Sequence, residues 1–156
     1  MKEEQVVNKL INNNETISSM ESCTAGYFAT TITNVDGSSS VLKYSAITYS
    51  NEFKIKMGVP KEIIDKYTVY SIETSKHMAK QISKYANSTY GVGITGQIGR
   101  LDPVNNTGNL NEIFVTIYNS KNDEYHSFEV KTSSSNRLEC KKDIVDKILD
   151  ELLNIL

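Results

Sequence analysis

The residues most able to do chemistry lie in the segment SSMESCTAGYFATT, residues 18–31. Ser22 ends a predicted strand and precedes a predicted helix, where free backbone amides can stabilise an oxyanion beside a serine nucleophile. The same position suits a serine that caps the helix, and the local pattern alone favours the cap. Cys23 is a second candidate nucleophile, although a small buried thiol is the commoner state of cysteine. The segment therefore indicates either an acyl-transfer site or an ordinary helix start.

A serine nucleophile needs a base, and the sequence offers histidine and lysine candidates. His77 lies within an amphipathic helix pattern and His126 near the start of a late strand, so a histidine base has little support. In the segment TYSNEFKIKMGV, residues 48–59, Lys54 and Lys56 follow a strand end. A lysine whose pKa is lowered by burial can act as a base. Most lysines are solvated surface groups, so this pattern alone is a weak signal.

The segment GVGITG, residues 91–96, has the glycine spacing of a dinucleotide-binding loop. Such a loop must follow a strand and open a helix, whereas here a helix pattern precedes the glycines and none follows them. We therefore predict a strand packed closely against a neighbour, which runs into a long binding loop at residues 95–108. Arg100 in that loop, and Arg137 at the start of the last helix pattern, could each bind an anion or form a surface ion pair.

Helix and strand patterns alternate along the rest of the chain. Periodicity predicts helices at 2–13, 24–33, 50–57, 60–67, 72–86 and 136–154, and strands at 16–20, 41–49, 90–95, 113–118 and 125–131. The apolar faces of the first and last helices are predicted to bury Val6, Val7, Leu10, Ile11, Leu138, Ile144, Val145, Ile148, Leu149 and Leu152. This alternation, without repeats or low-complexity linkers, predicts one α/β domain over residues 1–156 with a mixed sheet.

Composition limits the function classes further. The 156 residues carry a net charge of -2, which argues against a surface built for nucleic acid. No apolar run reaches the roughly 18 residues of a membrane span, and the first residues lack a signal-peptide pattern, so we expect a cytoplasmic protein that binds no membrane. Cys23 and Cys140 are expected to be reduced thiols. Two histidines exclude a histidine-rich metal site, and we expect neither metal nor cofactor.

Three ordered segments resemble the C-terminal domain family of the competence/damage-inducible protein CinA: MESCTAG, GSSSVLKYSAITYSNEFKIKMGVP and GVGITG. The family pattern has an E-S-C-T-G-G motif, a G-S-S segment, Y-S-N-x-x-K-x-x-x-G-V and a T-G-x-A-G-P loop. Arg137 with Lys141 resembles the basic pair that opens the family's last helix. Two departures stand out. Ala25 replaces a motif glycine, and QIGRLDPVNNTGN follows Gly96 in place of the A-G-P segment.

The resemblance implies a three-layer α/β/α fold and a metal-independent amidohydrolase, which deamidates nicotinamide mononucleotide to nicotinic acid mononucleotide and ammonia. It implies that Ser22 is the nucleophile, that Lys54 is its base or activator, and that Tyr49 orients groups around them. The expected substrate-binding residues are Cys23 and Thr24, through backbone amides that would stabilise an oxyanion, together with Thr95, Gly96 and Arg137.

The altered loop at residues 97–109 supports an alternative, which is a catalytically silent relative that binds a nucleotide or a protein partner. The expected partner of the enzyme is a small-molecule nucleotide substrate. The exposed ends of a small mixed sheet are also compatible with a homodimer.

Overall fold

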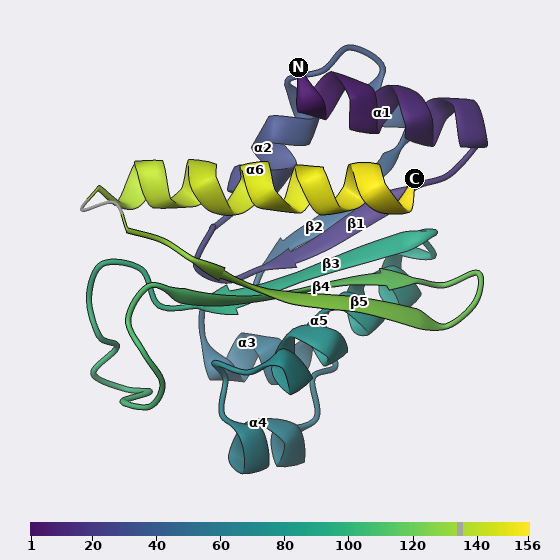
Figure 1. Ribbon diagram of the computed structural model, residues 1–156. Coiled ribbons are helices and arrows are strands. Elements are labelled where there is room, and N and C mark those ends of the chain that lie inside the picture. The colour runs from purple at the N-terminus through teal and green to yellow at the C-terminus, as the bar shows by residue number, and fades with distance from the viewer. Residues whose placement is uncertain (134–135) are drawn as a thin grey trace.

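The computed structural model describes residues 1–133 and 136–156, and a five-stranded mixed sheet lies at its centre (Figure 1). The strands in chain order are β1 (Ile17–Glu21), β2 (Leu42–Ile47), β3 (Tyr90–Gly96), β4 (Glu112–Asn119) and β5 (Glu124–Lys131). Across the sheet the order is β2-β1-β3-β4-β5. The pairs of β1 with β2 and β3 are parallel, and β4 pairs antiparallel with β3 and with β5.

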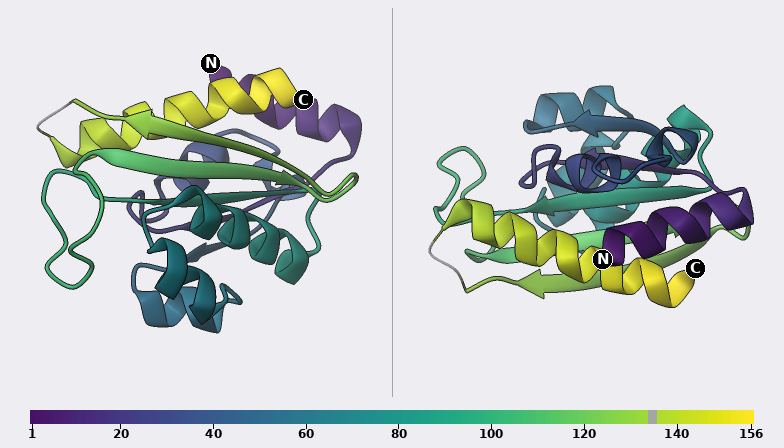
Figure 2. Two further views of the ribbon diagram at one scale, coloured as in Figure 1. Left: turned by 60° about the horizontal axis from the view of Figure 1, so that its bottom comes forward. Right: turned by 90° about the horizontal axis from the view of Figure 1, so that it is seen from above.

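Helices cover both faces of the sheet, as Figures 1 and 2 show. One face carries α1 (Lys2–Asn13), α2 (Tyr27–Thr33) and α6 (Arg137–Ile155), and the other carries α3 (Asn51–Lys56), α4 (Lys61–Tyr67) and α5 (Ile72–Ala86). A 3-10 turn, η1 (Ser38–Ser40), precedes β2. The predicted three-layer α/β/α fold with a mixed sheet is therefore confirmed. Within the described residues, no helix combines the length and apolar character needed to cross a membrane.

The glycine-rich segment forms the buried central strand β3, as predicted. Val92 and Ile94 point into the core on the α1 and α6 side, while the intervening glycines face α5. A Cβ at Gly91 would lie 2.0 Å from the carbonyl oxygen of Ala79, and one at Gly93 would lie 2.3 Å from that of Ser75. These glycines let α5 pack directly on the strand backbone, and they bind no dinucleotide phosphate at a helix start.

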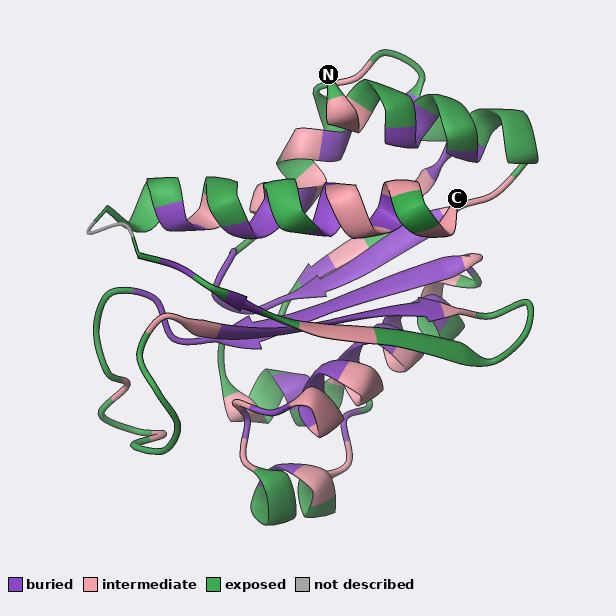
Figure 3. Ribbon diagram, in the orientation of Figure 1, coloured by how far each residue is buried: buried purple, intermediate pink, exposed green. Residues whose placement is uncertain are grey.

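The outer helices follow the predicted hydrophobic faces with two exceptions. Both carry their expected buried residues (Figure 3), namely Val6, Val7, Leu10, Ile144, Val145, Ile148, Leu149 and Leu152. Ile11 is instead 38% exposed because it lies at the edge of the buried stripe, over the turn at Gly37. Leu138 is 50% exposed because it lies in the first turn of α6, before the part of the helix that packs in the core. Both were predicted to be buried, and both predictions were wrong.

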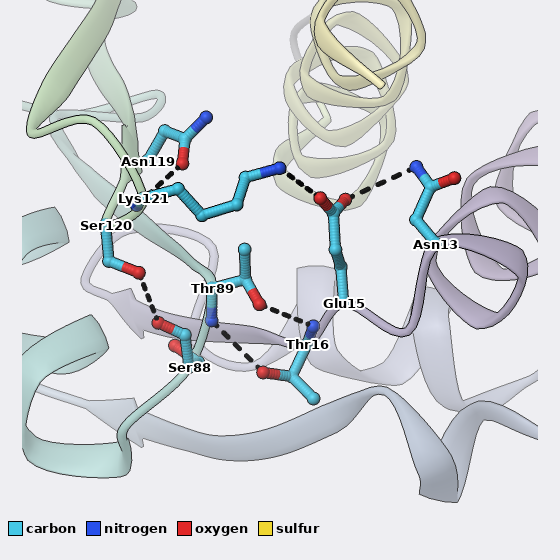
Figure 4. A network of polar contacts seen from close by, with 8 residues as sticks. All are labelled: Asn13, Glu15, Thr16, Ser88, Thr89, Asn119, Ser120 and Lys121. Carbon is cyan, nitrogen blue, oxygen red and sulfur yellow. Dashed lines mark hydrogen bonds and ion pairs between the residues drawn. The ribbon is translucent and has the colours of Figure 1, made fainter.

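At the amino ends of β1 and β3, polar contacts hold the two strands in register (Figure 4). The N–H of Thr16 donates to Oγ1 of Thr89 at 3.0 Å, and the N–H of Thr89 donates to Oγ1 of Thr16 at 3.1 Å. Beside them, Lys121 forms an ion pair with Glu15. The opposite end of the sheet, at the left of Figure 1, brings together the carboxyl ends of β1, β2 and β3, the start of α6 and the loop between β3 and β4. Ligands of open α/β sheets commonly bind at this end.

Candidate active site

Ser22 lies in a tight turn immediately after β1. Its N–H donates to the carbonyl of Ile94 at 3.0 Å, and its own carbonyl accepts from the N–H of Ala25 at 3.0 Å. Ala25 and Gly26 then adopt positive φ angles of 48° and 89°, and α2 begins only at Tyr27. The helix was predicted to start at residue 24, and this start was wrong. Gly26 occupies the cap position, so the alternative in which Ser22 caps the helix is not the observed one, and the serine hydroxyl is left to other contacts.

The start of α2 is stabilised by Glu21, the last residue of β1, whose side chain is fully buried. Its Oε1 accepts from the N–H of Phe28 at 3.0 Å and from Oγ1 of Thr24 at 2.7 Å. Its Oε2 accepts from the N–H of Ala29 at 3.1 Å and from Oγ of Ser19 at 3.1 Å. These bonds occupy amides that a helix start leaves without partners. Glu21 therefore fixes the turn that holds Ser22, a role that sequence reasoning missed.

Lys54 reaches Ser22 from α3 and is only 2% exposed. Its Nζ donates to Oγ of Ser22 at 3.1 Å and to the carbonyl of Thr48 at 2.7 Å. Burial lowers the pKa of Lys54 from 10.5 to about 8, because the charged form loses its hydration. Lys56, on the same short helix, is exposed and pairs with Glu52 at 2.8 Å. The structure thus separates the two candidate lysines and brings Lys54 to the serine.

Cys23 is buried beside Ser22, and its thiol is a weak candidate nucleophile. Burial raises the pKa of Cys23 from 9.0 to about 12, and the nearby charge of Lys54 offsets only part of that effect. The thiolate is the reactive form of cysteine, so Cys23 stays in its unreactive form at neutral pH. Cys140 is also buried, and no disulfide joins the two cysteines.

Ser22 opens into a cavity of about 540 Å³ at the carboxyl end of the sheet. The residues that line it are Ser22, Cys23, Tyr49, Ser50, Asn51, Glu52, Tyr70, Gly96, Gln97, Ile98, Arg100, Asp102, Pro103, Val104, Asn105 and Arg137. Five of the predicted site residues are among them: Ser22, Cys23, Tyr49, Gly96 and Arg137. Neither His77 nor His126 lines this cavity.

Thr24 and Thr95 were also predicted to bind substrate, but neither lines the cavity. The hydroxyl of Thr24 donates to Glu21, and that of Thr95 donates to the carbonyl of Val69 at 2.8 Å. Both side chains support the turns around the site. The backbone N–H groups of Cys23 and Thr24 make no hydrogen bond to another backbone group in the described part of the chain. They stay our predicted oxyanion donors.

The loop between β3 and β4 forms one wall of the cavity through a polar network. Side chains of Asn51 and Asn105 exchange two hydrogen bonds, of 2.8 and 3.1 Å, which link this loop to the start of α3. Asp102 accepts from the hydroxyl of Tyr70 at 2.8 Å, and its own N–H donates to Oε1 of Gln97 at 2.8 Å. Sequence reasoning placed a binding loop here but did not identify these residues. The Tyr70–Asp102 and Asn51–Asn105 contacts join residues 32 and 54 positions apart, beyond the reach of any local pattern.

Arg137 lies in the first turn of α6, at the edge of the cavity. One of its terminal nitrogens donates to the carbonyl of Ile98, and the other lies 3.5 Å from the hydroxyl of Tyr49. Within the described residues, neither Arg137 nor Arg100 forms an ion pair with a carboxylate. Both residues line the cavity.

The fold and site together define an α/β protein with a buried serine–lysine pair beneath a ligand-sized cavity. The sequence profile described as the CinA C-terminal domain matches residues 1–156. The chain therefore belongs to the CinA C-terminal domain family.

Curated relatives agree with this assignment. A CinA-like protein of Endomicrobium trichonymphae is 36% identical over 148 residues, which cover 94% of this chain and 33% of that protein. A Clostridium botulinum protein (strain ATCC 19397 / Type A) named as competence-damage inducible is 46% identical over 98 residues, or 62% of this chain and 24% of that protein. The chain thus spans about a quarter to a third of the length of these relatives.

The fold also matches crystal structures at low sequence identity. A competence or damage-inducible protein from Enterobacter asburiae has a TM-score of 0.90 at 19% identity, covering 99% of this chain and 95% of that one. A CinA superfamily protein from Escherichia coli has a TM-score of 0.90 at 17% identity, covering 99% and 88%. At such identities the likeness concerns the fold alone.

Proposed function

We propose that this domain is an amidohydrolase that converts nicotinamide mononucleotide to nicotinic acid mononucleotide and ammonia. The observation that carries the proposal is the 3.1 Å contact between Nζ of buried Lys54 and Oγ of Ser22, at the base of a cavity of about 540 Å³. A serine hydroxyl is a weak nucleophile until a neighbouring base removes its proton. A lysine with a pKa of about 8 is partly neutral near physiological pH and can serve as that base.

The contacts of Lys54 suit proton transfer. A neutral amine has two N–H donors and one lone pair, and the carbonyl of Thr48 accepts one donor at 2.7 Å. The lone pair is then available for the proton of the Ser22 hydroxyl. As the serine oxygen attacks the carboxamide carbon, Lys54 takes that proton, and the carbonyl oxygen becomes an oxyanion. The backbone N–H groups of Cys23 and Thr24 are the proposed donors to this oxyanion.

Collapse of the tetrahedral intermediate breaks the carbon–nitrogen bond. The proton held by Lys54 passes to the departing nitrogen, which leaves as ammonia, and the substrate acyl group stays on Ser22 as an ester. A water molecule then attacks the ester, Lys54 accepts its proton, and the same proton returns to the serine oxygen. One water is consumed, and one acid and one ammonia are produced.

The remaining lining groups suit a nucleotide with a phosphate. Arg137 and Arg100 carry guanidinium groups at the cavity, and a planar guanidinium binds phosphate oxygens in pairs. Tyr49, beside Arg137, would orient the bound substrate. The altered loop forms a wall of the cavity and leaves space within it, so this departure from the family pattern is compatible with substrate entry.

Ammonia release from nicotinamide mononucleotide by the purified protein tests the proposal. Ser22→Ala should lose at least 99% of the rate, whereas Ser40→Ala, an exposed serine of η1, should keep it. Full activity in Ser22→Ala would remove the serine from the mechanism. Calorimetry on the same proteins completes the experiment: nucleotide binding by the unsubstituted protein without ammonia release would instead identify a silent binding module.

A further inference from the structure

Asp102, in the loop between β3 and β4, places a carboxylate on the cavity wall. Its Oδ2 accepts from the hydroxyl of Tyr70 at 2.8 Å and from Nδ2 of Asn105 at 3.0 Å. Its Oδ1 accepts from the N–H of Val104 at 2.9 Å. The backbone N–H of Asn105 adds a further hydrogen-bond interaction, and together these donors orient the carboxylate on the cavity wall.

The charge of Asp102 acts on Lys54 through the electric field, where it partly offsets the burial that lowers the pKa of that lysine. Among the residues that the structure describes, no lysine or arginine forms an ion pair with Asp102. Burial alone would raise its pKa, but hydrogen bonds from Val104, Tyr70 and Asn105 lower that pKa below the ordinary 3.8. The carboxylate is thus ionised at neutral pH, and its neutral donors fix the charge in place without cancelling it.

Other groups around the cavity also suit a cation. Tyr49 and Tyr70 supply aromatic rings, whose faces attract positive charge. Glu52 also lines the cavity, but its carboxylate is already paired with Lys56 at 2.8 Å. Arg100 and Arg137 supply positive charge to the same cavity, so its walls match a ligand that carries both a cationic part and an anionic part.

Building on the proposed amidohydrolase function, we propose that Asp102 determines specificity by selecting carboxamides on a positively charged pyridinium ring over neutral rings of the same shape. The ring nitrogen of nicotinamide mononucleotide is such a cation, and its phosphate is the anion that the arginines would bind. Asp102 belongs to the segment that departs from the family's A-G-P loop. The preference for a positively charged ring is therefore expected to depend on the sequence of this loop in this chain.

The test compares two ligands that differ in one ring atom: nicotinamide mononucleotide and its benzamide analogue, in which a neutral carbon replaces the ring nitrogen. Binding is measured by calorimetry in the Ser22→Ala background, so that neither ligand is consumed. The background protein should bind the charged ring roughly tenfold more tightly, as expected for one partly solvated charge pair. Asp102→Asn should abolish this preference, and Asp102→Glu should retain most of it.

Asp65→Asn is the matched control, because Asp65 is an exposed carboxylate of α4 paired with Lys61 at 2.6 Å. It should leave the preference unchanged. No preference in the Ser22→Ala protein would overturn the inference whatever the variants do. An equal loss of affinity for both ligands in Asp102→Asn would also overturn the inference. Asp102 would then contribute through contacts with the sugar or through the structure of the loop, and the charge of the ring would not matter.

Ammonia assays on proteins that keep Ser22 separate this inference from the proposed function. If the charge preference depends on Asp102 but no ammonia is released, the selection stands and the amidohydrolase proposal fails. If ammonia is released and Asp102→Asn leaves the ratio of kcat/KM values for the two ligands unchanged, the amidohydrolase proposal stands and the selection fails.

Discussion

Replacing Lys54 with methionine tests the proposed base through both activity and stability. Methionine keeps a long, unbranched side chain in the buried site but has no titratable group. General-base catalysis contributes roughly 10²–10⁴-fold, so Lys54→Met should lose at least about two orders of magnitude in kcat/KM. Lys56→Met is the matched control, because that lysine is exposed on the same helix. It should keep kcat/KM within about twofold, since exposed ion pairs contribute little.

The pH profile follows from the lowered pKa of Lys54. With a pKa of about 8, roughly one molecule in ten has a neutral Lys54 at pH 7, which is roughly 300-fold more than at the ordinary pKa of 10.5. In the unsubstituted protein, kcat/KM for ammonia release should therefore rise about tenfold per pH unit below pH 8 and level off above it. A profile that is flat between pH 6 and 9, or that falls as pH rises, would refute the role of neutral Lys54 as the base.

The same lowered pKa makes stability depend on pH. Between about pH 8 and 10.5 the unfolded chain holds the Lys54 proton more tightly than the folded protein does, so the contribution of Lys54 to the free energy of unfolding rises with pH in this window. The rise approaches about 1.4 kcal/mol per pH unit, or about 3 kcal/mol in all. The burial cost is fully present below pH 8 and gone above 10.5.

Urea denaturation of the unsubstituted protein and of Lys54→Met, at pH 7 and pH 9.5, isolates the contribution of Lys54 to the free energy of unfolding. Cys23, whose raised pKa removes stability above pH 9, is present in both proteins and largely cancels in the difference. The free energy of unfolding of the unsubstituted protein, relative to the variant, should increase by about 2 kcal/mol between the two pH values. An unchanged difference would mean that Lys54 is not buried as described.

Three further substitutions test the scaffold. Glu21→Gln should lower the free energy of unfolding by about 2–4 kcal/mol in urea, because one side-chain oxygen becomes a donor facing the α2 amides; a loss below about 0.5 kcal/mol would contradict the capping role. Ala25→Gly should raise the melting temperature by a few degrees, since glycine removes a left-handed strain of about 1 kcal/mol, and a lower melting temperature would show that the strain is absent. Gly93→Ala should lower the free energy of unfolding by more than about 3 kcal/mol or prevent folding, because its Cβ would lie 2.3 Å from the carbonyl oxygen of Ser75. A variant of normal stability in thermal unfolding would contradict the close packing of α5.

Much of the fold could be predicted from the sequence, because hydrophobic periodicity follows directly from which face each element buries. The glycines at 91 and 93 are an example, since their alternation with Val92 and Ile94 indicated a strand in close contact with a neighbour. Helix boundaries were less predictable. The start of α2 depends on Glu21, whose carboxyl group reaches amides seven and eight residues further along the chain.

Site residues could be predicted from the sequence only where they belong to a recognised motif. Ser22 and Lys54 are 32 residues apart in the sequence, and this spacing alone predicts no contact. The prediction that they act together came from the resemblance of their motifs to the family pattern. Asp102, by contrast, is in a segment that departs from the family pattern, so no motif marked it. Its role depends on Tyr70 and Asn105, which the folded loop brings to its carboxylate.

Trapping the acyl-enzyme tests the proposed mechanism most directly. The purified protein is mixed with nicotinamide mononucleotide, quenched in acid within milliseconds to seconds, digested and examined by mass spectrometry. We predict a mass increase equal to the substrate's acyl group on Ser22, which forms and decays with ammonia release and is absent from Ser22→Ala. An adduct on Cys23 instead, or undiminished ammonia release by Ser22→Ala, would contradict the serine–lysine mechanism.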